Sequence, residues 1–226
     1  MDKETIRTMM KASRTQISED ERIRAAATLV PVMMEALASF NVLPDSQTLS
    51  IPNIIGLYVS YESEFPTLAL EQALCARGAR VAFPVCFSGG RMEFALEPES
   101  EIEGEPDSEP DSEPDSEPEG RQRGALRALL AKNPAHIFDE AEPELADLCL
   151  IDAHSLSALI LPVVAFDSEG YRIGSGSGYY DRYLLRLKPG TPTLGIAYDT
   201  QQVAEFPHEA HDIPLTCILT PNNGKM

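Results

Sequence analysis

The sequence lacks the features that would direct a protein into or across a membrane. No uninterrupted apolar run approaches the roughly 18 residues that a membrane span needs, and residues 1–13 mix both signs of charge without the apolar core of a signal peptide. The four cysteines lie far apart and form no Cys-x-x-Cys pair, which is typical of thiols in a reducing compartment rather than of zinc ligands or disulfides. These absences predict a cytoplasmic protein with no membrane partner.

Basic residues are also scarce. The chain has 18 Lys and Arg against 36 Asp and Glu, a formal net charge of −18. Twelve of the acidic residues lie in residues 97–119, which contain no Lys or Arg, so the rest of the chain carries only −6. Nucleic-acid binders use basic patches to neutralise phosphates. The composition therefore predicts no nucleic-acid partner, and it leaves small anionic ligands at a local site open.

The acidic segment has low sequence complexity. Residues 105–116 are three copies of Glu-Pro-Asp-Ser. With almost no apolar side chain to bury, and with like charges repelling, such a segment cannot offset its conformational entropy. We expect a disordered acidic insertion over residues 98–121, inside a single domain that spans residues 1–226. An acidic interaction arm is the alternative.

The rest of the chain alternates between strand and helix patterns. Residues 54–60 predict a buried strand, residues 67–77 a helix that Gly78 ends, and residues 80–85 a second strand, which together begin a βαβ arrangement. Further strands are predicted at 156–166, 193–198 and 216–220, and further helices at 125–132, from 179, and at 201–206. The sequence thus predicts a single-domain α/β fold whose largely parallel or mixed sheet is flanked by helices.

The first forty residues also read as helix. Ser18 and Glu21 have the spacing of a capping box, and apolar residues follow at helical intervals. Pro31 is expected to kink or restart this helix, because proline lacks the backbone N–H that the helix interior uses.

A glycine-rich loop lies between the strand at 156–166 and the helix from 179. Glycine and serine alternate over residues 174–178, and glycine lets backbone amides approach a phosphate closely. Arg172 at the loop entrance would supply a counter-charge, and Asp181 in the first helical turn a magnesium ligand. The loop matches neither Gly-x-x-x-x-Gly-Lys-[Ser/Thr] nor Gly-x-Gly-x-x-Gly. On spacing alone, a phosphate site and a simple tight turn both stay open.

The longer string is more specific. Residues 159–184, LILPVVAFDSEGYRIGSGSGYYDRYL, closely resemble the signature of the 5-formyltetrahydrofolate cyclo-ligase family. The resemblance extends to the helix start with Lys3 and Arg7, to residues 58–67, and to residues 194–220. It implies an enzyme that uses ATP and Mg²⁺ to convert 5-formyltetrahydrofolate into 5,10-methenyltetrahydrofolate. ADP and phosphate would be released, and the formyl oxygen would be phosphorylated on the way to an iminophosphate.

The resemblance also implies roles for individual residues. Arg172 and Tyr179 would be catalytic, and Tyr179 would contact the folate as well as the loop. The residues implied to bind ATP are Lys3, Arg7, Gly174, Ser175, Gly176, Ser177, Gly178, Tyr179 and Tyr180. Read without the family, the two basic residues could form a solvated helix face, and the tyrosines could simply pack the helix on the sheet.

The metal and folate contacts complete the implied site. Asp181 and Asp212 match the two positions that the family uses for magnesium, although Asp181 could instead only cap its helix. Tyr61 and Glu64 are the implied folate contacts, with Glu62 as an alternative acid. The family has a second acid where this chain has Pro66. Lys132 is a further candidate phosphate contact, and His211 is assigned no catalytic role.

Two other functions compete with catalysis of this reaction. The first is a non-catalytic, cyclo-ligase-like protein that binds folate or nucleotide. The second is a sugar-phosphate isomerase or acyltransferase on a related sheet, which would need neither the basic pair near the amino terminus nor the His-Asp-Ile-Pro segment near the carboxyl terminus. Nothing in the sequence requires more than a monomer.

Overall fold

The computed structural model describes residues 1–43, 53–96, 125–132, 137–139 and 148–222. The predicted acidic insertion lies outside these described residues. Within them, no helix is long and apolar enough to cross a membrane.

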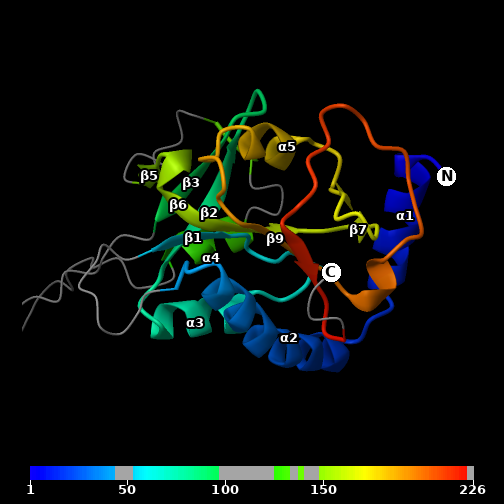
Figure 1. The fold of residues 1–226 in the computed structure, drawn as a ribbon, viewed down its shortest axis with the longest axis horizontal. Coiled ribbons are helices and arrows are strands. Elements are labelled where there is room, and N and C mark those ends of the chain that lie inside the picture. Colours follow the sequence, from blue (N-terminus) through cyan, green and yellow to red (C-terminus); the bar gives the residue numbers. More distant parts are fainter. Residues whose placement is uncertain (44–52, 97–124, 133–136, 140–147, 223–226) are drawn as a thin grey trace, which may run out of the picture.

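One mixed sheet organises the described part of the chain (Figure 1). Its strands run in the order β10-β9-β6-β1-β2-β3-β5, and β4 pairs with β2 beside this path. Their bounds are β1 Ile54–Leu57, β2 Arg80–Phe87, β3 Met92–Leu96, β4 Ile137–Phe138, β5 Cys149–Ile151, β6 Leu156–Pro162, β9 Thr193–Ile196 and β10 Cys217–Leu219. The strands from β10 to β2 are mutually parallel, whereas β3 is antiparallel to both β2 and β5. The predicted α/β fold with a mixed, mostly parallel sheet is confirmed.

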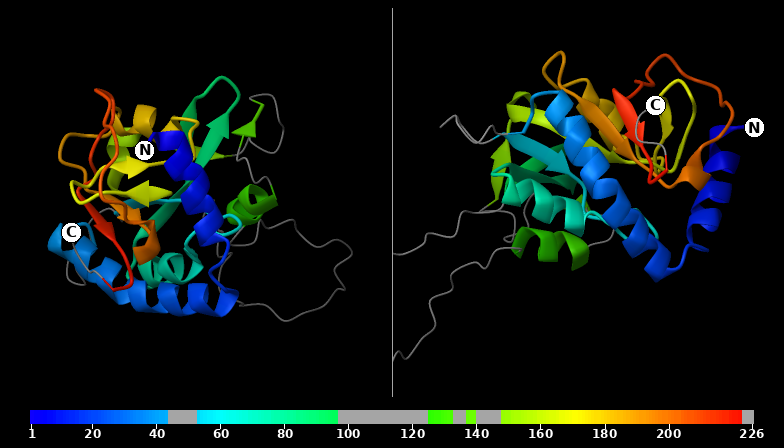
Figure 2. Two further views of the ribbon diagram at one scale, coloured as in Figure 1. Left: turned by 90° about the vertical axis from the view of Figure 1, so that its right-hand side faces the viewer. Right: turned by 60° about the horizontal axis from the view of Figure 1, so that its bottom comes forward.

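Helices cover both faces of this sheet (Figures 1 and 2). The helices α2 (Glu19–Ser39), α3 (Leu68–Ala76) and α4 (Ala125–Lys132) pack on one face, where Leu29, Leu74 and Leu130 are buried with strand residues. The short α5 (Tyr179–Leu184) packs on the other face. The amino-terminal α1 (Lys3–Arg14) stands beyond the sheet and packs against the small hairpin of β7 (Ala165–Phe166) and β8 (Arg172–Ile173).

Several local predictions are confirmed, and the boundaries of others change. Ser18 and Glu21 form the predicted capping box. The helix α2 continues through Pro31, because Leu29, Met33 and Leu37 on its other side are buried against the sheet. The strand predicted at 54–60 ends at residue 57, and the strand predicted at 156–166 is divided into β6 and β7.

The prediction of a helix at residues 201–206 is wrong. Only the 3₁₀ turn Asp199–Gln201 forms, and the backbone N–H of Val203 bonds to the carbonyl of Phe166. The Gln201 side chain is buried and donates to the carbonyls of Val163 and Val164, at 2.6 and 2.9 Å. These tertiary hydrogen bonds hold the segment extended and also mark the break between β6 and β7.

The chain order places a cavity at one edge of the sheet. From β1 the chain passes to β2 on one side, and it later returns through β6 to β9 and β10 on the other. The carboxyl ends of β1 and β6 are therefore the switch point of the sheet, where ligands bind in open α/β folds.

Candidate active site

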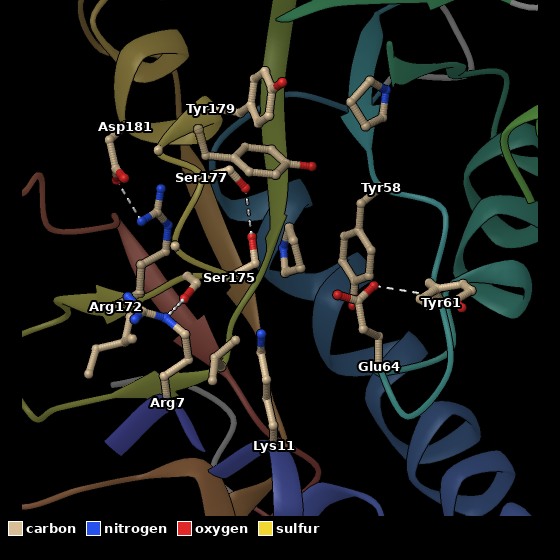
Figure 3. Close-up of a pocket in the computed structure, with 18 of the residues that line it drawn as sticks. Arg7, Lys11, Tyr58, Tyr61, Glu64, Arg172, Ser175, Ser177, Tyr179 and Asp181 are labelled. Carbon is tan, nitrogen blue, oxygen red and sulfur yellow. Dashed lines mark hydrogen bonds and ion pairs between the residues drawn. The ribbon is translucent and has the colours of Figure 1, made fainter. Parts of the chain in front are cut away.

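A cavity of about 590 Å³ opens at this switch point (Figure 3). It is lined by α1, by the segment after β1, by the glycine loop after β8, and by residues near the carboxyl terminus. Apart from Lys132, the site residues predicted from the sequence line it, namely Lys3, Arg7, Tyr61, Glu64, Arg172, Gly174, Ser175, Gly176, Ser177, Gly178, Tyr179, Tyr180, Asp181 and Asp212. The fold thus brings together residues that are up to 209 positions apart.

The glycine loop has backbone geometry that only glycine adopts readily. Gly176 has a φ of +109° and Gly178 a φ of +68°, both in the left-handed region. A Cβ added at Gly174 would meet no atom within 4 Å, so the chain is open to a ligand there. The helix that follows has only six residues, so its dipole adds little positive potential at the loop.

The helix α1 supports this loop from the side. Arg7 Nε donates to the carbonyl of Gly174 at 2.9 Å, and its guanidinium lies next to Gly176. Lys11 and Arg14 on the same helix also line the cavity, and neither was predicted as a site residue. The sequence did contain a signal for these two residues. The basic side chains of this helix are spaced by four, four and three positions and so share one helix face, at Lys3, Arg7, Lys11 and Arg14.

Two ion pairs each join a predicted phosphate-binding cation to a predicted metal ligand. Arg172 Nη1 lies 2.8 Å from Asp181 Oδ1, and the Arg172 side chain is only 5% exposed. Lys3 Nζ lies 2.5 Å from Asp212 Oδ2 and 3.1 Å from Glu209 Oε1.

The ion pair between Lys3 and Asp212 shifts the pKa of both partners. Burial alone would raise the pKa of Asp212, but the hydrogen bonds from Lys3 and from the backbone of Glu209 outweigh burial and lower it. Burial alone would lower the pKa of Lys3, and the bonds to Asp212 and Glu209 raise it instead. The pair is therefore fully charged at neutral pH.

At the other end of the cavity, acidic and aromatic side chains predominate. Glu64 Oε2 accepts a hydrogen bond from the backbone N–H of Tyr61 at 3.1 Å. Burial raises the pKa of Glu64, although Arg14 and Lys11 counteract part of that effect. Figure 3 shows Glu64, Tyr58 and Tyr61 together on the side of the cavity opposite Arg7 and Arg172.

The turn that carries Glu64 is strained and held by two arginines. Glu62 has a φ of +49°, an uncommon value for a residue other than glycine. Arg22 Nη1 donates to the Glu62 carbonyl at 2.6 Å, and Arg14 Nε donates to Ser63 Oγ at 3.1 Å. No sequence motif indicated this role for Arg22, because the contact joins residues 40 positions apart.

The two tyrosines of α5 line the cavity and also pack on the sheet, so the packing alternative holds alongside their place in the site. Tyr179 donates its hydroxyl to the carbonyl of Phe87 at 3.2 Å. Burial raises the pKa of Tyr180 well above its ordinary value, which keeps the phenol neutral. Arg182 lies over the Tyr179 ring and donates to the carbonyls of Ser177 and Gly90, so it links the glycine loop to the β2–β3 turn.

Three other residues complete the description of the cavity and its surroundings. Lys132 is exposed at the end of α4 and is not among the residues that line the cavity. His211 does line it, and its ring lies 3.6 Å from Glu209. Cys86 lines the cavity from β2, and burial raises its pKa to about 12, so it is an apolar wall rather than a nucleophile.

A cavity at the switch point of an α/β sheet, with a glycine loop and cations facing an acidic and aromatic end, is typical of enzymes that bind a phosphorylated ligand beside a second substrate. The sequence model of the 5-formyltetrahydrofolate cyclo-ligase family matches residues 1–221, and the chain belongs to this family. Its activity is that of a 5-formyltetrahydrofolate cyclo-ligase, a ligase of folate one-carbon metabolism.

Individual relatives agree with this assignment. The 5-formyltetrahydrofolate cyclo-ligase of Escherichia coli K12 is 32% identical over 172 residues, which cover 74% of this chain and 78% of the relative. The enzyme of the same name from Haemophilus influenzae is 42% identical over 80 residues, covering 34% of this chain and 42% of the relative.

Two solved structures share the fold. A 5,10-methenyltetrahydrofolate synthetase from Mycoplasma pneumoniae superposes with a TM-score of 0.67 at 19% identity, covering 98% of this chain and 99% of the other. The synthetase from Aquifex aeolicus gives a TM-score of 0.63 at 22% identity, covering 99% and 91%.

Proposed function

We propose that the cavity binds ATP at its cationic end and 5-formyltetrahydrofolate at its acidic and aromatic end, and that it transfers the γ-phosphoryl group between them. The observation that carries this proposal is the division of one cavity into two chemically different ends, with Arg7, Arg172 and the glycine loop facing Glu64 and Tyr61. Phosphoryl transfer requires mainly positioning and charge stabilisation, which such a cavity can supply.

The proposed reaction has two stages. The formyl oxygen attacks the γ-phosphorus of ATP, and ADP departs with the electron pair of the broken P–O bond. The resulting iminophosphate is attacked at its carbon by the 10-nitrogen, which forms the new C–N bond. The C–O bond then breaks, inorganic phosphate departs with its electron pair, and the proton of the 10-nitrogen leaves with the phosphate. The products are 5,10-methenyltetrahydrofolate, ADP and phosphate.

Residues at the cationic end would hold the triphosphate. Arg7 is fixed by its bond to Gly174, and the buried Arg172 is fixed by its bond to Asp181, so both guanidinium groups are preorganised. Lys3 would add a third positive charge from the same helix face as Arg7. We assign Arg172 a catalytic role, because a buried cation next to the loop can stabilise charge on the transferred group.

The donor set also suits a magnesium ion. Asp181 and Asp212 offer hard oxygen atoms, and Mg²⁺ commonly takes one or two carboxylates with the remaining positions filled by phosphate and water. In the described part of the chain, no group of three or more His, Cys, Asp and Glu residues gathers as a metal site, so phosphate oxygens would be needed to complete one. When bound, the metal neutralises and orients the phosphate oxygens.

The other end would recognise the folate. Glu64 is held by the Tyr61 backbone and can accept hydrogen bonds from the amino and N–H groups of the pterin. We propose that Tyr61 and Tyr179 contact the ring system, and that Glu64 acts without the second acid that Pro66 replaces. We further propose a monomeric, single-domain enzyme that carries out this folate reaction in the cytoplasm.

The test is the formation of 5,10-methenyltetrahydrofolate, followed by its absorbance, from purified protein, ATP, Mg²⁺ and 5-formyltetrahydrofolate. A product that needs all three additions supports the proposal. Tight binding of folate or nucleotide with no product would identify the non-catalytic alternative. ATP consumption with sugar phosphates in place of the folate would refute both the proposed reaction and the non-catalytic alternative.

A further inference from the structure

Lys11 differs from the other cations that line the cavity, because its ammonium group forms no hydrogen bond or ion pair with any residue that the structure describes. Lys3, Arg7, Arg14 and Arg172 each form a hydrogen bond or an ion pair. Among the described residues, none forms a hydrogen bond or ion pair with the Lys11 ammonium group, although Lys11 lines the cavity. Figure 3 shows its side chain rising from α1 into the cavity. The proposed binding of the two substrates gives this cation no role so far.

The position of Lys11 follows from the course of α1. Arg7 on this helix contacts the glycine loop, and Arg14 contacts Ser63 in the turn that carries Glu64. The helix therefore passes from the phosphate end of the cavity to the folate end. Lys11 comes one turn after Arg7 and about one turn before Arg14, roughly 6 and 4.5 Å along the axis. Its electrostatic effect on Glu64 agrees with a place between the two ends.

We propose that Lys11 is a catalytic residue that contacts the phosphoryl group while it passes from ATP to the formyl oxygen. This inference rests on the function proposed above. In that step the bond from the γ-phosphorus to the ADP oxygen breaks as the bond to the formyl oxygen forms, and ADP keeps the electron pair. The moving group must cross the region between the two ends, where Lys11 lies.

The charge and freedom of Lys11 suit this role. Negative charge is spread over the oxygens of the transferred group, and a cation aimed at it lowers the barrier only if it binds the transition state better than the bound substrates. Because no ion pair with a described residue has to be broken, the Lys11 ammonium group can follow the phosphoryl group, and it can then stabilise the phosphate that departs after ring closure. The paired cations Lys3 and Arg172 lack this freedom.

Three variants test the proposal. Lys11→Met removes the charge and keeps a long, unbranched side chain, and Lys11→Arg keeps the charge. Lys188→Met removes an exposed lysine that does not line the cavity and serves as the matched control. We expect Lys11→Met to lower kcat by on the order of 100-fold, with less than about threefold changes in the KM values of ATP and 5-formyltetrahydrofolate. Lys11→Arg should recover at least a tenth of the wild-type kcat, and Lys188→Met should match the wild type.

A binding measurement gives a readout that does not depend on turnover. ADP with aluminium fluoride and Mg²⁺ mimics the transferred phosphoryl group, so Lys11→Met should weaken binding of that mixture at least tenfold in the presence of 5-formyltetrahydrofolate. Binding of ADP alone should change less than threefold. Equal weakening of both would overturn the proposal.

Other results identify other roles for Lys11. A rise of tenfold or more in either KM at unchanged kcat would show that Lys11 only holds a bound substrate and would overturn the proposal. A rise in KM that is confined to folates with several glutamate residues would also overturn the proposal, because it would show that Lys11 contacts the glutamate tail. Failure of the proposed function can be distinguished from failure of the Lys11 proposal, because in the first case the wild-type protein itself would form no methenyl product.

Discussion

Replacing Gly176 by alanine should impair ATP use more than it impairs folding. Gly176 has a φ of +109°, which an L-residue adopts only with strain of about 1–3 kcal/mol. The added Cβ would lie 3.4 Å from Arg7 Cζ, an ordinary contact distance, so the backbone strain and not a clash is the main effect. The loop can relieve that strain by moving, and movement would separate the Gly174 carbonyl from Arg7 Nε, now 2.9 Å away.

The size of the effect follows from that hydrogen bond. A hydrogen bond to a charged group contributes about 1.5–3 kcal/mol, and each 1.4 kcal/mol corresponds to a tenfold change in affinity. We expect the KM for ATP to rise about tenfold or more, and the KM for 5-formyltetrahydrofolate to change several-fold less. A strain of 1–3 kcal/mol should lower the melting temperature by about 2–4 °C for each kcal/mol in a chain of this size.

Gly190→Ala is the matched control. Gly190 has a φ of +87°, and a Cβ there would meet no atom within 4 Å, so the variant adds comparable strain outside the cavity. Thermal melting and steady-state kinetics should show a loss of stability in both variants and a rise in the KM for ATP in Gly176→Ala alone. If both variants, or neither, change that KM, the assignment of the loop to the phosphate is wrong.

Three further substitutions test other contacts. Glu64→Gln should raise the KM for 5-formyltetrahydrofolate about tenfold or more, because it removes a charged acceptor. It should also raise the melting temperature at pH 7 but not near pH 4.5, since burial raises the pKa of Glu64 and its ionised form costs stability as the pH rises above 4.5. Asp181→Asn should lower magnesium-dependent turnover about tenfold or more and increase the magnesium concentration for half-maximal rate. Arg182→Lys should raise the KM for ATP several-fold, because lysine cannot bond the carbonyls of both Gly90 and Ser177 in the same fixed geometry.

For each of these three substitutions, one result would contradict the prediction. A Glu64→Gln protein that is no more stable than the wild type at pH 7 would mean that the carboxyl group is well solvated. Unchanged magnesium dependence in Asp181→Asn would leave Asp181 as a residue that only pairs with Arg172. For Arg182→Lys, loss of stability with unchanged kinetics would make the contact purely structural.

The sequence by itself determined the family, the alternating α/β pattern and many of the residues that line the cavity. Its strongest signals were local, since the string from the strand at 156–166 through the glycine loop to Asp181 is continuous. Lys3 and Arg7 were assigned through the resemblance to the family's helix start, and their spacing of four residues agrees with one shared helix face. Short-range spacing of this kind is readable without knowing how the chain folds.

The tertiary structure decided which of these residues touch. The pairs Lys3–Asp212 and Arg172–Asp181 form because the cavity brings separate segments together, and no spacing indicates which cation meets which acid. The extended conformation near Gln201 was likewise decided by bonds to distant carbonyls, which outweigh the local preference for helix. The place of Lys11 between the two ends of the cavity also needed the fold, because it depends on what α1 contacts at each end. Long-range contacts of this kind are set by packing rather than by local sequence.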